Sequence, residues 1–251
     1  MAQQRLDKII ASTGRYSRRE VKTLVREGCV LVDGRIAASA EDKCDPLTAR
    51  ISVNGEEIFY REHTYVMLHK PAGVLSATED GRGETVLDLL APEYRKIGLF
   101  PVGRLDKDTE GLLLLTDDGA LAHDLLAPKK HVDKVYFVRT DGALDDADCK
   151  AFEQGITLGD GLECLSAKLE ILKSNAQSEA LITIHEGKFH QIKRMLASRG
   201  KPVVYLKRLS MGSLTLDEGL SKGEYRLLTA EEIKNLRESG QFAQGKAGAD
   251  K

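Results

Sequence analysis

Apolar residues near the N-terminus recur with the spacing of helices. In "RLDKIIAST" they lie three and four positions apart, and the pattern stops at Gly14, which predicts a short helix. Ser17 and Glu20 have the spacing of a capping box for a second helix over "RREVKTLVREG", which Gly28 ends. "CVLVDGRIA" then predicts a strand, an Asp-Gly turn and a second strand.

From Tyr65 onward, strand patterns dominate. Strands are predicted over "YVMLHKPAGVLSA", "GLLLLTDDG", "KVYFVRTDG", "AKLEILK", "EALITIHEG" and "VVYLKRLSMGSLTL", and helices over "ALAHDLLAP", "DADCKAFEQGI", "KFHQIKRMLASRG" and "TAEEIKNLRESG". Because many strands adjoin through short turns, we expect an α+β fold with a mixed, largely antiparallel sheet. The predicted organisation is a small domain at 1–60, a larger domain at 61–240 and a disordered tail at 241–251.

The composition excludes several classes of protein. The chain of 251 residues is 41% hydrophobic and 30% charged, as in soluble globular proteins. It has no apolar run long enough to cross a membrane, and its first residues lack the apolar region of a signal peptide. Its four cysteines form no C-x-x-C pair, which argues against a disulfide framework or a zinc site. We therefore expect a cytoplasmic protein without membrane contact.

Charge is distributed unevenly along the chain. Residues 1–30 carry seven Lys or Arg against three acids, and residues 181–210 carry seven against one. Residues 141–180 instead hold nine acids against three Lys. Two basic regions offset by an acidic one suit phosphate binding, although ordinary solvated charge explains the same counts.

The segment "GRLDKDTEGLLLLTDDG" has the acid spacing of a calcium loop. Asp106, Asp108 and Glu110 precede Gly111, and Asp117 follows six residues later. A calcium loop needs a helix on each side, but "KIGLFPVGRL" and "LLLLTDDG" predict extended chain. We therefore expect no metal site. We expect Asp108 and Glu110 to face solvent or to bond within the turn, and Asp106 to have another role.

The N-terminal unit carries a row of cations. Arg18, Lys22 and Arg26 lie four positions apart on one side of the second predicted helix. Such a row beside a tight hairpin can follow a phosphate backbone. The order "RLDK…G…SRREVKTLVREGCVLVDGR" resembles the S4 RNA-binding domain (αL-type). The alternative is a helical cap with a solvated basic face.

Five ordered motifs of the remaining chain resemble the RNA pseudouridine synthases. They are "HKPAGVLSA", "GRLDKDTEGLLLLTDDG", "KVYFV", "EGKFHQIKRML" and "LKRLSMGSLTLDEGLSKGEYRLLTAEE". The combination is most similar to the RsuA/RluB/RluE/RluF branch, which also carries an S4 domain. Lys193 after "HQI" and the chain length most resemble the RsuA type. The resemblance implies isomerisation of one uridine in small-subunit ribosomal RNA, with the large-subunit RNA as the alternative.

The resemblance assigns catalytic roles to three residues. Asp106 would attack C1′ of the ribose or remove the C2′ proton, as the N1–C1′ bond breaks. Burial favours a neutral acid, so the cation of Lys193 would keep Asp106 ionised. Tyr136 would stack on the uracil and relay the C5 proton, although a core position is its alternative. The isomerisation has no by-product and so implies no cofactor. His190 and Gln191 would be structural or would contact the sugar.

Nine basic residues are the candidates for contact with RNA: Arg5, Arg18, Arg19, Lys22, Arg26, Lys70, Arg104, Arg194 and Arg208. A structural ion pair is the alternative for Arg104. The target uridine has to leave its stack to reach Asp106. The implied partner is ribosomal RNA, within a small-subunit assembly intermediate, and the protein is expected to be a monomer. The competing function is that of an RNA-binding ribosome-assembly factor whose isomerase activity is secondary or absent.

Overall fold

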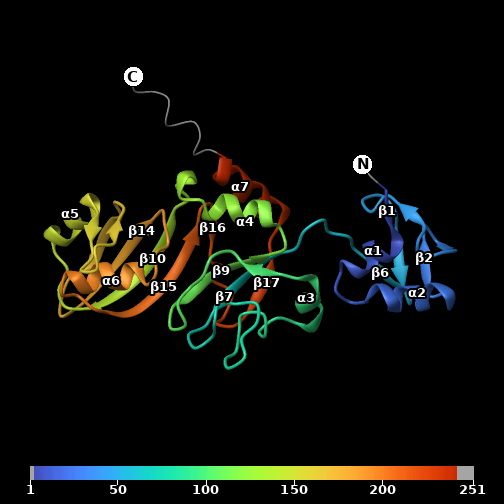
Figure 1. Cartoon of the computed structure of the whole chain (residues 1–251), viewed down its shortest axis with the longest axis horizontal. Coiled ribbons are helices and arrows are strands. Elements are labelled where there is room, and N and C mark those ends of the chain that lie inside the picture. Colours follow the sequence, from blue (N-terminus) through green and yellow to red (C-terminus); the bar gives the residue numbers. More distant parts are fainter. Residues whose placement is uncertain (1–2, 242–251) are drawn as a thin grey trace, which may run out of the picture. The chain divides into compact units, whose positions relative to one another are not determined.

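The computed structural model describes residues 3–241 and divides into two compact units (Figure 1). The smaller unit extends to Thr64 and also takes in Leu90–Leu99, and the larger comprises Tyr65–Leu89 and the chain from Phe100 onward. Of the predicted tail, Gln241 ends the last helix and 242–251 lies outside the described residues. Within the described part, no helix combines the length and apolar character needed to cross a membrane.

The smaller unit combines short helices with two small sheets. Its helices are α1 (Leu6–Ala11), α2 (Arg18–Arg26) and α3 (Pro92–Ile97), and its strands are β1 (Gln4–Arg5), β2 (Val30–Val32), β3 (Arg35–Ile36), β4 (Lys43–Cys44), β5 (Ile51–Val53) and β6 (Glu56–Ile58). Strand β1 pairs with β4, and the other four strands follow the order β3-β2-β5-β6. All these pairings are antiparallel.

Local sequence signals explain this unit. The predicted capping box of α2 is present: the Glu20 amide donates to Ser17 Oγ at 3.2 Å, and the Ser17 amide donates to Glu20 Oε2 at 2.6 Å. Asp33 and Gly34 both have positive φ (50° and 78°), which suits the tight β2–β3 hairpin. The apolar stripes of the two helices meet strand residues in one core, including Leu6, Ile9, Ile10, Val21, Val25, Val30, Ile51 and Val53.

The larger unit is built on a nine-stranded sheet. The strands of this unit, including two outside that sheet, are β7 (Tyr65–Lys70), β8 (Phe100–Pro101), β9 (Glu110–Thr116), β10 (Lys134–Asp141), β11 (Ile156–Thr157), β12 (Glu163–Cys164), β13 (Lys168–Lys173), β14 (Gln177–Ile184), β15 (Val203–Met211), β16 (Leu214–Thr215) and β17 (Tyr225–Leu227). Its helices are α4 (Gly119–Leu126), α5 (Asp146–Gln154), α6 (Gln191–Ser198) and α7 (Ala230–Gln241), with a 3₁₀ turn at Pro128–Lys130.

The main sheet follows the order β13-β14-β10-β15-β9-β7-β17, with β16 on β15 and β8 on β9. The β15–β9 pair is parallel and the other pairs are antiparallel. Strands β11 and β12 form a separate pair. The prediction of an α+β fold with a mixed, largely antiparallel sheet is therefore confirmed.

Helices α4 and α7 share an apolar core with strands β7 and β9 of the sheet, beside which they lie in Figure 1. The alternating positions Tyr65 and Met67 of β7 join Leu112 and Leu114 of β9 in this core. Helix α4 begins directly after Asp118, because Asp118 accepts a hydrogen bond from the Leu121 amide at 3.0 Å and caps the helix.

The parallel contact between β9 and β15 joins the two halves of the sheet at a glycine. Gly111 has φ of 105° and lies opposite Arg208 in the register. A Cβ on Gly111 would lie 2.2 Å from the Arg208 carbonyl oxygen, so no other residue fits without a backbone shift. Because the two backbones approach so closely here, the start of β9 lies directly beside β15, the middle strand of the sheet order.

Candidate active site

Asp106 lies on the turn between β8 and β9, and the ammonium of Lys70 holds that turn. Lys70 Nζ lies within hydrogen-bond distance of the backbone carbonyls of Pro71 (3.0 Å), Asp106 (3.1 Å), Lys107 (3.2 Å) and Thr109 (2.9 Å), which share its three N–H donors. The Lys70 side chain ends β7 and is fully buried. Burial lowers its pKa to about 8, against the opposing effect of nearby carboxylates. The prediction that Lys70 binds RNA is therefore wrong, because its ammonium is buried and is bonded to backbone carbonyls of the protein.

The backbone just before Asp106 is fixed as well. Buried Ser76 donates from Oγ to the Leu105 carbonyl at 2.9 Å, and the Leu105 amide donates back to Ser76 Oγ at 3.1 Å. The Gly73 amide donates to the Lys107 carbonyl at 2.7 Å. The Asp106 turn is therefore held by Lys70 and also by Gly73 and Ser76, which lie in the segment that follows β7.

Lys193 of α6 pairs with two carboxylates of this turn. Its Nζ lies 2.8 Å from Asp106 Oδ2 and 2.5 Å from Asp108 Oδ1. Burial opposes the charge of Lys193, but the hydrogen bonds to the two carboxylates prevail and raise its pKa. The hydrogen bond from Lys193 likewise lowers the pKa of Asp108, whose side chain is 75% exposed. The structure thus brings Asp106 and Lys193 together across 87 residues of sequence.

Tyr136 borders the same cavity as Asp106 and Lys193, which measures about 60 Å³. It lies on β10, where it is opposite Arg208 of β15, and it is buried. Because β9, β15 and β10 are neighbours in the sheet, the turn before β9 and the ring on β10 face one cavity. The three predicted catalytic residues are therefore close in space.

His190 and Gln191, at the start of α6, have different roles in the structure. Gln191 is buried: its Nε2 donates to Glu186 Oε1 at 2.8 Å, and its Oε1 accepts from the Lys188 amide at 3.0 Å. Both side chains border the cavity, but the Gln191 amide is hydrogen-bonded inside the protein, whereas His190 Nε2 lies 3.6 Å from Asp106 Oδ1. No motif or periodicity in the sequence separates these two neighbours.

Glu110 does not face solvent as expected. It is 7% exposed, at the start of β9, and pairs with Lys222 at 2.8 Å. The Tyr205 hydroxyl donates to it at 2.8 Å. Burial alone would raise the Glu110 pKa, but these two partners lower it.

The flanks of the Asp106 turn are strands, and lysines contact its carboxylates Asp106, Asp108 and Glu110. Within residues 3–241, no group of three or more metal-ligating side chains is suited to hold an ion.

Arg208 is also buried, which contradicts its predicted contact with RNA. Its side chain is 2% exposed, because β15 runs between β9 and β10. Its Nε donates to the Leu112 carbonyl at 2.7 Å. By contrast, Arg104 is exposed at the cavity, and Arg194 pairs with Asp160 at 2.5 Å with 28% of its side chain exposed. Arg104 has no ion-pair partner within residues 3–241, so it stays a candidate for RNA contact.

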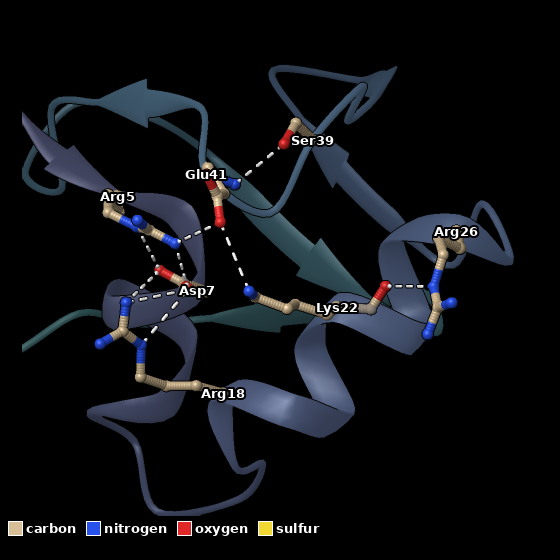
Figure 2. Close-up of polar contacts among 7 residues, drawn as sticks. All are labelled: Arg5, Asp7, Arg18, Lys22, Arg26, Ser39 and Glu41. Carbon is tan, nitrogen blue, oxygen red and sulfur yellow. Dashed lines mark hydrogen bonds and ion pairs between the residues drawn. The ribbon is translucent and has the colours of Figure 1, made fainter.

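In the smaller unit, two acids organise the predicted basic row (Figure 2). Buried Asp7 pairs with Arg5 and Arg18, each at 3.0 Å. Burial opposes the Asp7 charge, but these two guanidinium groups lower its pKa. Glu41 pairs with Arg5 at 2.9 Å and with Lys22 at 3.4 Å. The two acids thus hold three cations side by side.

The other two cations that were predicted to contact RNA in that unit, Arg19 and Arg26, lie on α2. Arg26 donates from Nε to the Lys22 carbonyl at 3.3 Å and is exposed, as is Arg19. Figure 2 shows Arg26 at the far end of the helix from Arg18. All five predicted basic residues of the smaller unit therefore keep a solvent-accessible side.

Comparisons with known proteins agree with this arrangement. The sequence model of the RNA pseudouridylate synthase family matches residues 64–198, and that of the S4 domain matches residues 4–46. A crystal structure of a pseudouridylate synthase superposes with a TM-score of 0.65 and 36% identity, over 93% of this chain and 99% of that one.

Three bacterial relatives match almost end to end. The uncharacterized RNA pseudouridine synthase YtzG of Bacillus subtilis (strain 168) is 51% identical over 93% of this chain and 98% of its own. The ribosomal small subunit pseudouridine synthase A of Vibrio cholerae is 40% identical (92% and 99% covered). The ribosomal large subunit pseudouridine synthase B of Bacillus subtilis is 39% identical (93% and 96% covered). The chain belongs to the RNA pseudouridine synthase family and carries an S4 domain, as predicted.

Proposed function

We propose that this chain isomerises one uridine of small-subunit ribosomal RNA to pseudouridine. The observation that carries the proposal is the cavity in which Asp106, Lys193 and Tyr136 meet. The similarity to relatives named for small-subunit and for large-subunit RNA is almost equal, at 40% and 39% identity. Lys193 after "HQI" favours the small subunit, and the large-subunit RNA is the alternative target.

In the proposed reaction, Asp106 acts on the ribose of a flipped uridine. Its carboxylate either attacks C1′ or removes the C2′ proton, and the N1–C1′ bond breaks with its electrons passing to the uracil. The uracil then turns and its C5 bonds to C1′, as the Asp106–C1′ bond breaks on the first route or as Asp106 returns the proton to C2′ on the second. The proton lost from C5 is balanced by one gained at N1. Lys193 holds the Asp106 carboxylate fixed in direction, because its ammonium lies 2.8 Å from Oδ2.

Tyr136 serves the detached base in this proposal. Its ring borders the cavity that holds Asp106 and is fixed in the central strand β10. A ring in this place keeps a free uracil stacked while it turns, and the hydroxyl relays the C5 proton. The cavity is far smaller than the ~300–1,000 Å³ of typical ligand pockets, so the RNA itself closes the rest of the site.

The S4 domain supplies affinity in this proposal. Arg5, Arg18 and Lys22 are held in position by Asp7 and Glu41, so they are pre-organised for phosphate oxygens. The proposed setting is cytoplasmic, where a monomer acts on RNA within a small-subunit assembly intermediate.

The decisive experiment maps pseudouridines in both ribosomal RNAs from cells with and without the protein. We expect one site to vanish from the small-subunit RNA and to return with the wild-type chain but not with Asp106→Asn. A missing site in the large-subunit RNA would identify the alternative target. Unchanged modification in the deletion strain, together with defective ribosome assembly that Asp106→Asn repairs, would favour the assembly-factor function instead.

A further inference from the structure

Phe189 presents an aromatic ring to solvent at the edge of the candidate active site. Its exposure, 72%, is high for so large an apolar side chain. The residue precedes His190, which borders the cavity and approaches Asp106. A single exposed apolar side chain needs no explanation by itself. An exposed ring next to the reacting carboxylate is a more specific arrangement.

The rings of Phe189 and His190 form a stack. Their centroids are 3.8 Å apart and their planes differ by 18°. His190 adopts φ of 49°, a left-handed conformation that costs energy for a residue with a side chain and tends to persist at functional sites. The inner ring therefore borders the cavity, while the outer ring keeps most of its surface open to solvent.

The segment that carries this stack is anchored. Buried Gln191 links Glu186 to the Lys188 amide, and Lys188 Nζ pairs with Glu186 Oε2 at 3.1 Å. These contacts fix the chain on both sides of Phe189. The exposure of the ring thus belongs to an ordered segment, so the ring is already in place before a ligand arrives.

The charge around the stack indicates what it binds. Lys188, Lys193 and exposed Arg104 also border the cavity, and Arg194 follows on α6. A flat aromatic face surrounded by cations suits a nucleobase, whose ring stacks while its phosphates meet the cations. Lys188, Lys193 and Arg194 already pair with carboxylates, whereas Arg104 has no ion-pair partner within residues 3–241 and is available for a phosphate of such a ligand.

We propose that Phe189 and His190 form a stacking platform for a nucleobase that flanks the target uridine. This proposal rests on the proposed function and extends it to a second nucleotide. When the uridine leaves the stack, its neighbour loses a stacking partner. The open face of Phe189 replaces that partner beside the cavity and stabilises the flipped-out state.

The sequence makes a direct test available, because the chain contains no tryptophan. Phe189→Trp therefore introduces a single fluorophore at the platform. In an Asp106→Asn background, which binds without turnover, we expect RNA transcripts of the two ribosomal subunits to quench its emission in step with binding. Leu172→Trp, on the edge strand β13 and 53% exposed, is the control and should keep its emission.

Kinetics provide the second measurement. Phe189→Leu keeps the apolar bulk but loses the ring, and we expect kcat/KM to fall about 10- to 100-fold, in the range of one lost base–aromatic stack. An abasic nucleotide at the flanking position should lower wild-type kcat/KM similarly but leave the Leu variant unaffected. Unquenched emission at saturating RNA, or a Leu variant with wild-type kcat/KM, would overturn the platform. If the wild-type chain forms no pseudouridine, the proposed function fails, while the quenching titration still decides on the platform.

Discussion

Replacing Lys70 by Met tests how the Asp106 turn is held. At neutral pH the change has two opposing effects on stability. Because burial lowers the Lys70 pKa from 10.5 to about 8, removing the charge recovers about 3 kcal/mol. Against this, the buried Thr109 carbonyl loses its donor, which costs about 1–3 kcal/mol. We therefore expect the free energy of unfolding to change by less than about 2 kcal/mol.

Activity should respond far more strongly than stability. The carbonyls of Pro71, Asp106 and Lys107 also lose the ammonium, and they recover hydrogen bonds only if the turn moves toward water. Such a movement shifts the Asp106 carboxylate, and a misplacement of about 1 Å costs on the order of 100-fold in rate. We expect kcat of Lys70→Met to fall at least about 100-fold.

The assay combines urea unfolding with single-turnover pseudouridine formation. Lys134→Met is the matched control, since Lys134 is also buried and burial lowers its pKa to about 8. Its acceptors, the carbonyls of Val132 and His185, lie outside the cavity lining. The control should keep its rate within about tenfold. A Lys70→Met variant with the wild-type rate, or one destabilised by more than about 4 kcal/mol, would refute this reasoning.

The lowered pKa of Lys70 also predicts a pH dependence. Between about pH 8 and 10.5 the unfolded chain keeps a proton that the folded chain has released, so the free energy of unfolding rises with pH. Lys70→Met should show a smaller rise than the wild type. Urea midpoints at about pH 7.5 and 9.5 measure the difference. An equal rise in the free energy of unfolding in both proteins would contradict the lowered pKa of Lys70.

Three further predictions address other parts of the structure. Asp108→Asn should lower kcat less than tenfold, because Lys193 keeps its ion pair with Asp106 in that variant. Lys193→Met removes this ion pair and should lower kcat at least about 100-fold. Equal losses in single-turnover assays would contradict this. Gly111→Ala should destabilise the protein by more than about 4 kcal/mol, because its Cβ meets the Arg208 backbone. Gly119→Ala, in open space at the start of α4, should stabilise the protein slightly. Thermal unfolding compares the two variants. The hydrogen bond from Arg226 lowers the pKa of Glu232 to about 2, so its stabilisation is present above about pH 4.5 and lost as pH falls toward 2. Glu232→Gln should flatten this acid dependence in urea unfolding, and an unchanged acid curve would count against the pair.

Local signals predicted the elements whose causes are local. The Ser17–Glu20 box and the Asp33-Gly34 hairpin formed where expected, because each depends on residues close in sequence. The partnership of Asp106 with Lys193 came from the family resemblance, since no periodicity links residues so far apart.

The errors concern charged residues that the fold buries. Lys70 and Arg208 were predicted to contact RNA, and Glu110 to face solvent or to bond within the turn, but all three side chains are buried. Each is buried beside a partner that only the folded sheet supplies: carbonyls of the turn for Lys70, the Leu112 carbonyl for Arg208, and Lys222 for Glu110. Tertiary hydrogen bonds of this kind leave no trace in the local sequence.

The Lys70 contact gives the calcium-like spacing of the Asp106 turn a different meaning. Four carbonyl oxygens of this region do converge on a cation, as they would around a bound ion. Here the cation is an ammonium tethered to the neighbouring strand β7. Because the Lys70 side chain keeps this ammonium at the turn, the turn holds its shape independently of the cations in solution. The turn is thus an ion-binding loop whose ion is part of the chain, and an untethered ammonium ion is the natural reagent to restore a shortened Lys70 side chain.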